Sequence, residues 1–172
     1  MVSFVHLHCH SEYSLLDGAN RIEDLIARAL EFEQPALAIT DHGNMHAAWE
    51  FQERAKKAGI KPILGMEAYV APGDRRSRQR IESTRGENGQ SRSRAYYHLV
   101  LLAQNATGYK NLVKLSSLGY TEGFYSKPRV DRELLARYSE GIVVSSACMA
   151  GEVATHLLGE NWDAARETAA WY

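Results

Sequence analysis

Residues 35–70 read PALAITDHGNMHAAWEFQERAKKAGIKPILGMEAYV and predict a strand, a helix and a second strand in succession. The apolar run at 35–40 has the composition of a buried strand, and 45–58 has a helical pattern that Gly59 ends. The apolar run at 61–70 predicts the second strand. A strand, a helix and a strand in this order are typical of a βαβ unit with parallel strands.

Comparable segments lie on both sides of this unit. Upstream, residues 4–8 (FVHLH) predict a strand, and we expect Asn20, with Glu23 as its capping-box partner, to begin a helix at 21–33. Downstream, we expect strands at 96–103 and 141–147 and helices at 109–118, 131–138 and 161–172, with Asp131 capping the second of these helices.

This alternation favours an α/β class, with either a doubly wound sheet or a barrel. We favour an incomplete barrel, because no strand follows the last helical segment to cover its apolar face. The length of 172 residues suits one domain. The 45% hydrophobic and 24% charged fractions are those of an ordinary globular protein, which argues against disorder and against a fibrous class.

The charge and the cysteine content narrow the class further. A formal net charge of -1 provides no global field that would hold nucleic acid. Cys9 and Cys148 are too few for a disulfide framework, and this suits a reducing compartment. The sequence has neither a secretory leader nor a run approaching the roughly 20 apolar residues of a membrane span, so we expect a cytoplasmic protein with no membrane contact.

The segment 72–95 is rich in arginine, with seven arginines against three acidic residues. Structureless loops of this length are usually functional or disordered. A solvated, mobile loop is the interpretation that we favour. The alternative is contact with a nucleic-acid phosphate backbone through Arg75, Arg76, Arg78 and Arg80.

Residues that can bind a metal recur near the ends of the predicted strands. His6, His8 and His10 alternate, so their side chains are expected on one face. Asp17 lies in the following loop, and Asp41 and His42 follow the strand at 35–40. We expect Asp41 to support His42 rather than to bind a metal itself. Further candidates on the later strands are Glu67, His98 and Cys148.

Glu67 is the single acid in the run ILGMEAYV, where a buried carboxylate needs a cation or a hydrogen-bond donor. The recurrence of His, Asp, Glu and Cys at successive strand ends predicts a metal site with room for two or three ions. Such sites hydrolyse phosphate esters. We interpret His46 and His156 as helical residues outside the site. No GxGxxG motif after a strand, P-loop or HExxH motif is present, so dinucleotide, P-loop and zincin functions lack their signature.

Six segments resemble the amino-terminal polymerase and histidinol phosphatase (PHP) domain of bacterial DNA polymerase III alpha subunits, and the resemblance runs from Phe4 to about Val153. They are HLHCHSEYSLLDGA, TDHGNM, KPILGMEAYVAPG, YHLVLLAQNATGYKNLVKL, EGFYSKPRVD and EGIVVSSACMAGEV. The connecting segments resemble the replicative polymerase branch and not merely the wider phosphoesterase superfamily.

The resemblance implies a distorted seven-stranded α/β barrel with up to three metal ions at one end, and a 3′ to 5′ exonuclease in some members. It implies that residues 1–172 are a partial domain, because a final Asp-x-His pair of ligands has no counterpart. It places His6 outside the metal shell. The ligands that it implies here are His8, His10, Asp17, His42, Glu67, His98 and Cys148.

The resemblance also implies a parent protein that synthesises DNA with Mg²⁺, in separate domains that these residues do not contain. Its implied partners are DNA, a sliding clamp, a clamp loader and a proofreading subunit. The implied ions of the PHP domain are zinc, manganese or iron. Two alternatives stay open, namely a metal-stabilised structural or docking module without catalysis, and a small-molecule phosphatase of the histidinol phosphatase type.

Overall fold

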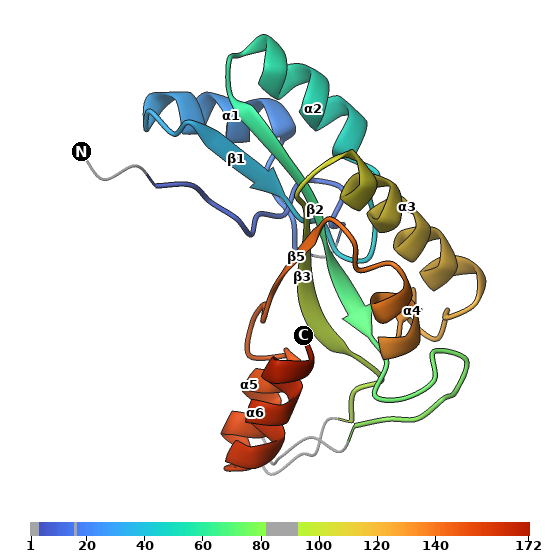
Figure 1. Cartoon of the computed structure of the whole chain (residues 1–172). Helices are drawn as coiled ribbons and strands as arrows, with labels where there is room; N and C mark the ends of the chain where they lie inside the picture. Colours follow the sequence, from blue (N-terminus) through green and yellow to red (C-terminus); the bar gives the residue numbers. More distant parts are fainter. Residues whose placement is uncertain (1–3, 16, 82–92) are drawn as a thin grey trace.

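The computed structural model describes residues 4–15, 17–81 and 93–172, and it confirms an α/β fold (Figure 1). Its strands form one mixed, five-stranded sheet. The neighbours in the main path are, in order, β1 (Ala36–Ile39), β2 (Lys61–Val70), β3 (Tyr97–Ala103) and β5 (Ile142–Ser145), while β4 (Arg129–Val130) pairs with β2.

The parallel βαβ unit predicted at 35–70 is confirmed, because β1 and β2 pair parallel, but the later strands do not all continue this direction. β1 and β4 run parallel to β2, but β3 is antiparallel to β2 and β5 is antiparallel to β3. The cause lies in the connection between β2 and β3, whose described parts, residues 71–81 and 93–96, contain no crossover helix. A parallel neighbour requires such a crossover, whereas a strand that simply returns pairs antiparallel.

β2 has two partners along the same edge. Its first half pairs with β1 through Ile39 and Leu64, and its last two residues pair with β4. β3 occupies the opposite edge of the second half of β2. The short stretch of β2 between its two parallel partners contains Glu67, which forms an isolated parallel bridge with His42.

The first segment follows β1 without forming a strand of its own. The amide of Ala38 donates to the carbonyl of His6 at 3.0 Å, and the amide of Thr40 donates to the carbonyl of Cys9 at 2.8 Å. The strand predicted at 4–8 is therefore extended chain held against β1, and this contact places it beside the sheet.

Six helices complete the described part of the chain. They are α1 (Ile22–Glu31), α2 (Ala48–Lys57), α3 (Ala106–Thr121), α4 (Arg132–Arg137), α5 (Glu152–Leu158) and α6 (Trp162–Trp171). Gly59, at φ +80°, follows the end of α2, and the carboxylate of Asp131 accepts from the amide of Leu134 at the start of α4, so both of these predictions are confirmed. The β4 strand was not predicted from the sequence, and α5 was anticipated only through the helical interpretation of His156, without bounds.

Asn20 does not cap the first helix. The residue before α1 is Arg21, which makes no side-chain capping bond. The amide group of Asn20 instead donates to the carbonyl of His10 at 3.0 Å. A tertiary contact has thus replaced the expected local one, and it fixes the backbone at His10.

Two apolar clusters lie against the sheet. One joins α1 and α2 to β1, with Ile22, Phe51 and Ile39 at its centre. The other joins β2 and β3 to α3 and α4, with Leu101 and Leu112 fully buried. Figure 1 shows α1 and α2 beside β1, with α5 and α6 at the opposite end of the molecule.

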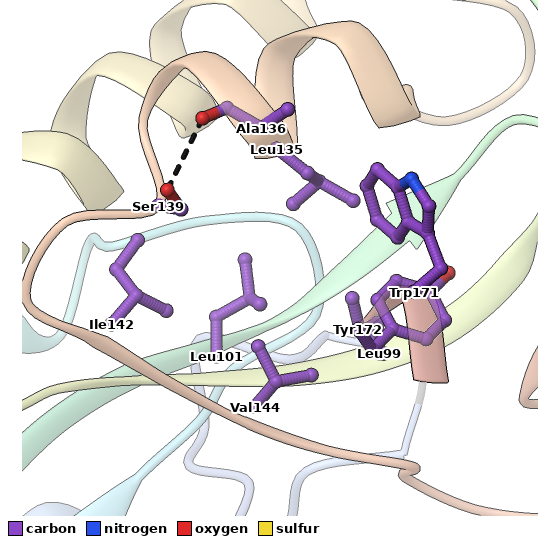
Figure 2. Close-up of a pocket in the computed structure, with 9 residues that line it drawn as sticks. All are labelled: Leu99, Leu101, Leu135, Ala136, Ser139, Ile142, Val144, Trp171 and Tyr172. Carbon is purple, nitrogen blue, oxygen red and sulfur yellow. Dashed lines mark hydrogen bonds between the residues drawn. The ribbon is translucent and has the colours of Figure 1, made fainter. Parts of the chain in front are cut away.

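A hollow of about 410 Å³ lies between β3, β5, α4 and the end of α6. Figure 2 shows it lined mainly by apolar side chains, with Leu101 and Val144 on the sheet side and Leu135 and Trp171 on the helix side. The helix predicted at 161–172 is present as α6, and Ala165 and Thr168 are its buried residues.

The arginine-rich segment is anchored at its base, which contradicts both a wholly solvated loop and a phosphate contact by Arg75. The side chain of Arg75 is 4% exposed and pairs with Glu122 at 2.6 Å, Glu133 at 2.9 Å and Asp131 at 3.0 Å. Arg76 shares Glu122, at 2.8 Å. Two of the seven arginines, Arg85 and Arg92, fall on residues 82–92, outside the described residues.

Arg129 joins the two ends of this segment to the sheet. Its guanidinium is 1% exposed and donates to the carbonyls of Arg75 and Ser77, both at 2.7 Å, of Gly123 at 3.1 Å and of Ala95 at 3.2 Å. Burial lowers the pKa of this guanidinium. Four carbonyls therefore compensate for a charge that has been removed from water.

We expect Arg129→Met to lower the free energy of unfolding by about 3 kcal/mol, because it leaves buried carbonyls without donors. Urea denaturation followed by circular dichroism measures this change. Arg28→Met is the matched control, because Arg28 is 63% exposed and its pair with Glu31 contributes less than about 1 kcal/mol. Equal losses in the two variants would contradict the role assigned to Arg129.

Candidate metal centre

The centre of the site is the carboxylate of Glu67 on β2, which is 1% exposed. His8 Nε2 lies 2.6 Å and His10 Nε2 lies 3.0 Å from Glu67 Oε2, and His98 Nδ1 contacts Glu67 Oε1. Burial alone would raise the pKa of Glu67, but the hydrogen bonds with His10, His8 and His98 lower it well below its ordinary value. Glu67 is therefore held as a carboxylate.

Three further predicted residues extend this cluster. His42 Nδ1 lies 3.8 Å from Glu67 Oε2, and His42 Nε2 lies 2.9 Å from Asp17 Oδ2. Cys148 Sγ lies 3.6 Å from His98 Nδ1. The seven predicted side chains thus form one continuous set of contacts. His6 is exposed and packs against Phe4 instead.

The turn after β1 positions His42. The amide of Glu67 donates to the carbonyl of Asp41 at 3.0 Å, and the amide of Gly43 donates to the carbonyl of Glu67 at 2.9 Å. Gly43 has φ +63°, and a Cβ at this position would lie 2.8 Å from the ring of Tyr69. Both the backbone conformation and the close approach therefore require glycine in TDHG.

His98 lies at the start of β3, whereas His42 follows the carboxyl end of β1. β3 runs antiparallel to β2, and Tyr69 is the register partner of His98. The beginning of β3 therefore lies at the same end of the sheet as the carboxyl end of β2. β5 is antiparallel to β3 in turn, so Cys148, just after β5, also lies at this end.

Asp41 anchors the preceding loop, which differs from the expected support of the His42 ring. Its carboxylate accepts from the amide and hydroxyl of Ser11 and from the hydroxyl of Ser14, each at 2.7 Å. Ser14 in turn accepts from the amide of His42 at 3.1 Å. Asp41 therefore fixes the loop that contains Asp17, and it reaches His42 only through Ser14.

The donor set fits bound cations. Two overlapping groups, His8, His10 and Glu67, and His42, Glu67 and His98, each have one ligand atom per residue within 4.8 Å of the others. The buried Nδ1 atoms of His10 and His42 have no hydrogen-bond partner among the described residues. Imidazole nitrogen and carboxylate oxygen are the ligands that zinc and similar ions take. Glu67 belongs to both groups, so it can serve two neighbouring ions.

The surroundings act differently on two of the imidazoles. The hydrogen bond with Glu67 raises the pKa of His10, whereas burial lowers the pKa of His42. His42 therefore tends to be neutral, which is the form that binds a metal.

A cleft of about 570 Å³ opens beside the cluster. Asp17, His42 and His98 line its inner part. Its outer part is lined by aromatic side chains and by the segment after α3, which includes Lys127. His46 is exposed on this cleft before the start of α2, outside the metal cluster, and His156 lies on α5.

Tyr69 and Tyr96 belong to the site but were not identified from the sequence. The ring of Tyr69 stacks on His42 at 5.7 Å, and the ring of Tyr96 stacks on His98 at 5.7 Å. Each tyrosine lies two residues from a predicted ligand in the chain, Tyr69 after Glu67 and Tyr96 before His98. The two-residue period of an extended strand was the signal that could have identified both.

A family model described as the PHP domain matches residues 6–172. The chain is 50% identical over 179 residues to the DNA polymerase III subunit alpha of Saccharopolyspora erythraea, covering 98% of this chain and 15% of that protein. It is 44% identical over 169 residues to the protein of the same name from Borreliella burgdorferi, covering 98% of this chain and 14% of that protein. The chain therefore spans about one seventh of the length of these relatives.

Among solved structures, an amidohydrolase from Chromobacterium violaceum aligns with a TM-score of 0.42 and 23% identity, over 66% of this chain and 34% of that one. None of the described helices is both long enough and apolar enough to span a membrane.

We expect Zn²⁺ or Mn²⁺ to raise the melting temperature of chelator-treated protein, because an ion bound only by the folded state stabilises it. At a free concentration 100 times the Kd, one ion adds about 2.7 kcal/mol. His10→Ala should lose most of this gain, whereas His46→Ala, in the same cleft but outside the cluster, should retain it. Differential scanning calorimetry makes the comparison, and an equal gain in both variants would contradict the assigned ligands.

We expect Asp41→Ala to lower the free energy of unfolding by about 3 kcal/mol, because three donors lose a buried acceptor. The variant should also bind metal more weakly, since Asp17 is no longer held. Asp74→Ala is the control, because Asp74 is 60% exposed and its loss should cost less than about 1 kcal/mol. Chemical denaturation and metal titration measure the two effects, and unchanged values for Asp41→Ala would contradict the anchoring role.

Proposed function

This chain belongs to the PHP domain family, and we propose that it hydrolyses phosphate esters with the help of divalent metal ions. The observation that carries the proposal is the buried carboxylate of Glu67, which four imidazoles surround within 4 Å. A protein core does not retain such a group for packing, because its burial is costly. A shared carboxylate between histidines is suited to hold ions close together.

We assign one ion to His8, His10 and Glu67 and a neighbouring ion to His42, Glu67 and His98, with Asp17 and Cys148 as additional ligands. Zinc, manganese and iron all suit this mixture of nitrogen, oxygen and sulfur donors. When bound, closely spaced ions of this kind stabilise the charge that develops on the attacking and leaving oxygens of a phosphate ester.

The residues of the chain orient the site. Glu67 fixes the imidazoles of His8, His10 and His98 by hydrogen bonds before any ion arrives. Asp41 holds the loop that brings Asp17 to His42. Tyr69 and Tyr96 cover the imidazoles of His42 and His98, which shields the inner end of the cleft from water.

We further propose that the whole protein is a replicative DNA polymerase alpha subunit, with this domain in its amino-terminal part. Support comes from relatives of 44–50% identity that carry this name. In that setting its partners are DNA, a sliding clamp, a clamp loader and a proofreading subunit, its polymerase domains use Mg²⁺, and it acts in the cytoplasm.

A metal-stabilised structural module is the second candidate, and one observation favours it. The contacts of Glu67 join segments that are far apart in the chain, 59 residues in the case of His8. Ions at this point would brace the domain whether or not hydrolysis occurs. A small-molecule phosphatase finds no support in the two polymerase relatives described above.

We expect the Mn²⁺-loaded protein to release nucleotides from the 3′ end of a 5′-labelled single strand, and His8→Ala to lower the rate by about 100-fold or more. Gel electrophoresis of the products measures the rate. His6→Ala is the matched control, two residues away and outside the cluster. Activity that survives both a chelator and His8→Ala would exclude the proposal. Stabilisation by metal without any product would leave the structural module as the function.

A further inference from the structure

We propose that Tyr120, Phe124 and Lys127 position a single strand of nucleic acid in the cleft beside the metal centre, with a base stacked on the two rings and a phosphate paired with the ammonium. This inference rests on the proposed function, because it assigns the residues that position the strand at the same site. It follows from the aromatic lining of the cleft, from its cation and from its size.

Aromatic rings continue from the metal centre to the surface. Tyr69 is 5% exposed against His42, and Tyr96 packs on Tyr69 at 4.6 Å. Further out, the rings of Tyr120 and Phe124 stack on each other at 6.2 Å, with 43% and 60% exposed. Solvent-exposed rings at the mouth of a cleft are suited to stack with nucleic-acid bases, because every base has a π-face.

Lys127 supplies positive charge within this lining. Its ammonium lies 5.5 Å from the centre of the Tyr69 ring, and it forms no ion pair with any described residue. Its nearest aromatic partner, Tyr69, stacks on His42 of the metal cluster. A compact ammonium without an acidic partner is suited to pair with a phosphate.

The positive charge continues along the same segment outside the cleft. Phe124, Ser126 and Lys127 line the cleft, whereas Tyr125 contacts two exposed arginines. Arg78 lies over its ring at 5.7 Å, and Arg80 donates to its hydroxyl at 3.4 Å. The next phosphates of a bound strand thus have cations on the adjoining surface. The phosphate contact considered for the arginine-rich segment therefore stays open for Arg78 and Arg80, but not for the buried Arg75.

The dimensions of the cleft select a single strand. A volume of about 570 Å³ lies within the range of small-ligand pockets and accommodates one or two nucleotides. The bases of a duplex are already stacked on each other and paired, so their faces are not free for Tyr120 and Phe124.

The test uses a hexathymidine with a central 2-aminopurine, whose fluorescence falls when the base stacks. Binding is measured in chelator, so that hydrolysis does not interfere. The unsubstituted chain should quench the fluorescence of the probe when it binds. Tyr120→Leu and Phe124→Leu should each weaken the Kd by about fivefold or more and reduce the quenching. Lys127→Gln should weaken binding and make it less dependent on salt, while quenching at saturation remains.

Matched controls separate this site from general surface effects. Trp49→Leu removes a ring that is 72% exposed on α2, and Lys114→Gln removes an exposed charge on α3; neither residue lines the cleft, and both variants should bind as the parent does. Circular dichroism verifies that each variant is folded. A parent chain without affinity for the probe, or equal Kd values for Tyr120→Leu and Trp49→Leu, would overturn the inference.

These measurements distinguish a failure of the nucleic-acid site from a failure of the proposed hydrolysis. A chain that quenches the probe through Tyr120 but never releases product retains the nucleic-acid site and loses the proposed catalysis. A chain that hydrolyses bis(p-nitrophenyl) phosphate with metal, at an equal kcat/KM in the parent and in Tyr120→Leu, and that does not bind the oligonucleotide, retains the catalysis and loses the nucleic-acid site.

Discussion

The burial of one carboxylate determines how the rest of this domain is arranged. Glu67 lies in the middle of a sheet, where a charge without partners would destabilise the fold. Imidazoles from the first segment, from the turn after β1 and from the start of β3 converge on it. Each of these elements is also held by its own backbone hydrogen bonds, so the carboxylate is compensated by groups whose positions are already fixed.

The sheet provides the space in which this convergence occurs. β1 and β4 pair with different halves of the same edge of β2, and Glu67 lies between the two paired stretches. The chain leaves β1 at Asp41 and His42, so the backbone diverges where the side chains of the site must fit. The cleft opens at this divergence, with the candidate metal ligands on its inner side and aromatic rings at its mouth. A substrate whose phosphate lies inward and whose base lies outward matches this order.

Local patterns in the sequence predicted the α/β class, most helices and a candidate ligand set. The candidate ligands could be named because strand ends carry functional groups, and because an acid within the apolar run around Glu67 needs a partner. The direction of the later strands was not predicted, since local patterns do not show how β2 is connected to β3. Arg75 and Arg129 were not identified as buried, because their partners, such as Asp131 and Gly123, are distant in sequence or are backbone carbonyls. Asn20 resembled a helix cap for the same reason, since its true partner at His10 is tertiary.

The period of two residues in β2 has a consequence for how such domains tolerate insertions and deletions. One residue inserted in β2 between Leu64, the last residue that pairs with β1, and Glu67 would turn the carboxylate to the opposite face of the sheet, away from every imidazole. Tyr69 would turn with it, so the stacking on His42 would be lost at the same time. By contrast, replacement of a single ligand leaves the strand parity intact. A single ligand replacement can therefore weaken metal binding while the register of the sheet is kept, whereas length changes in β2 have to occur in pairs.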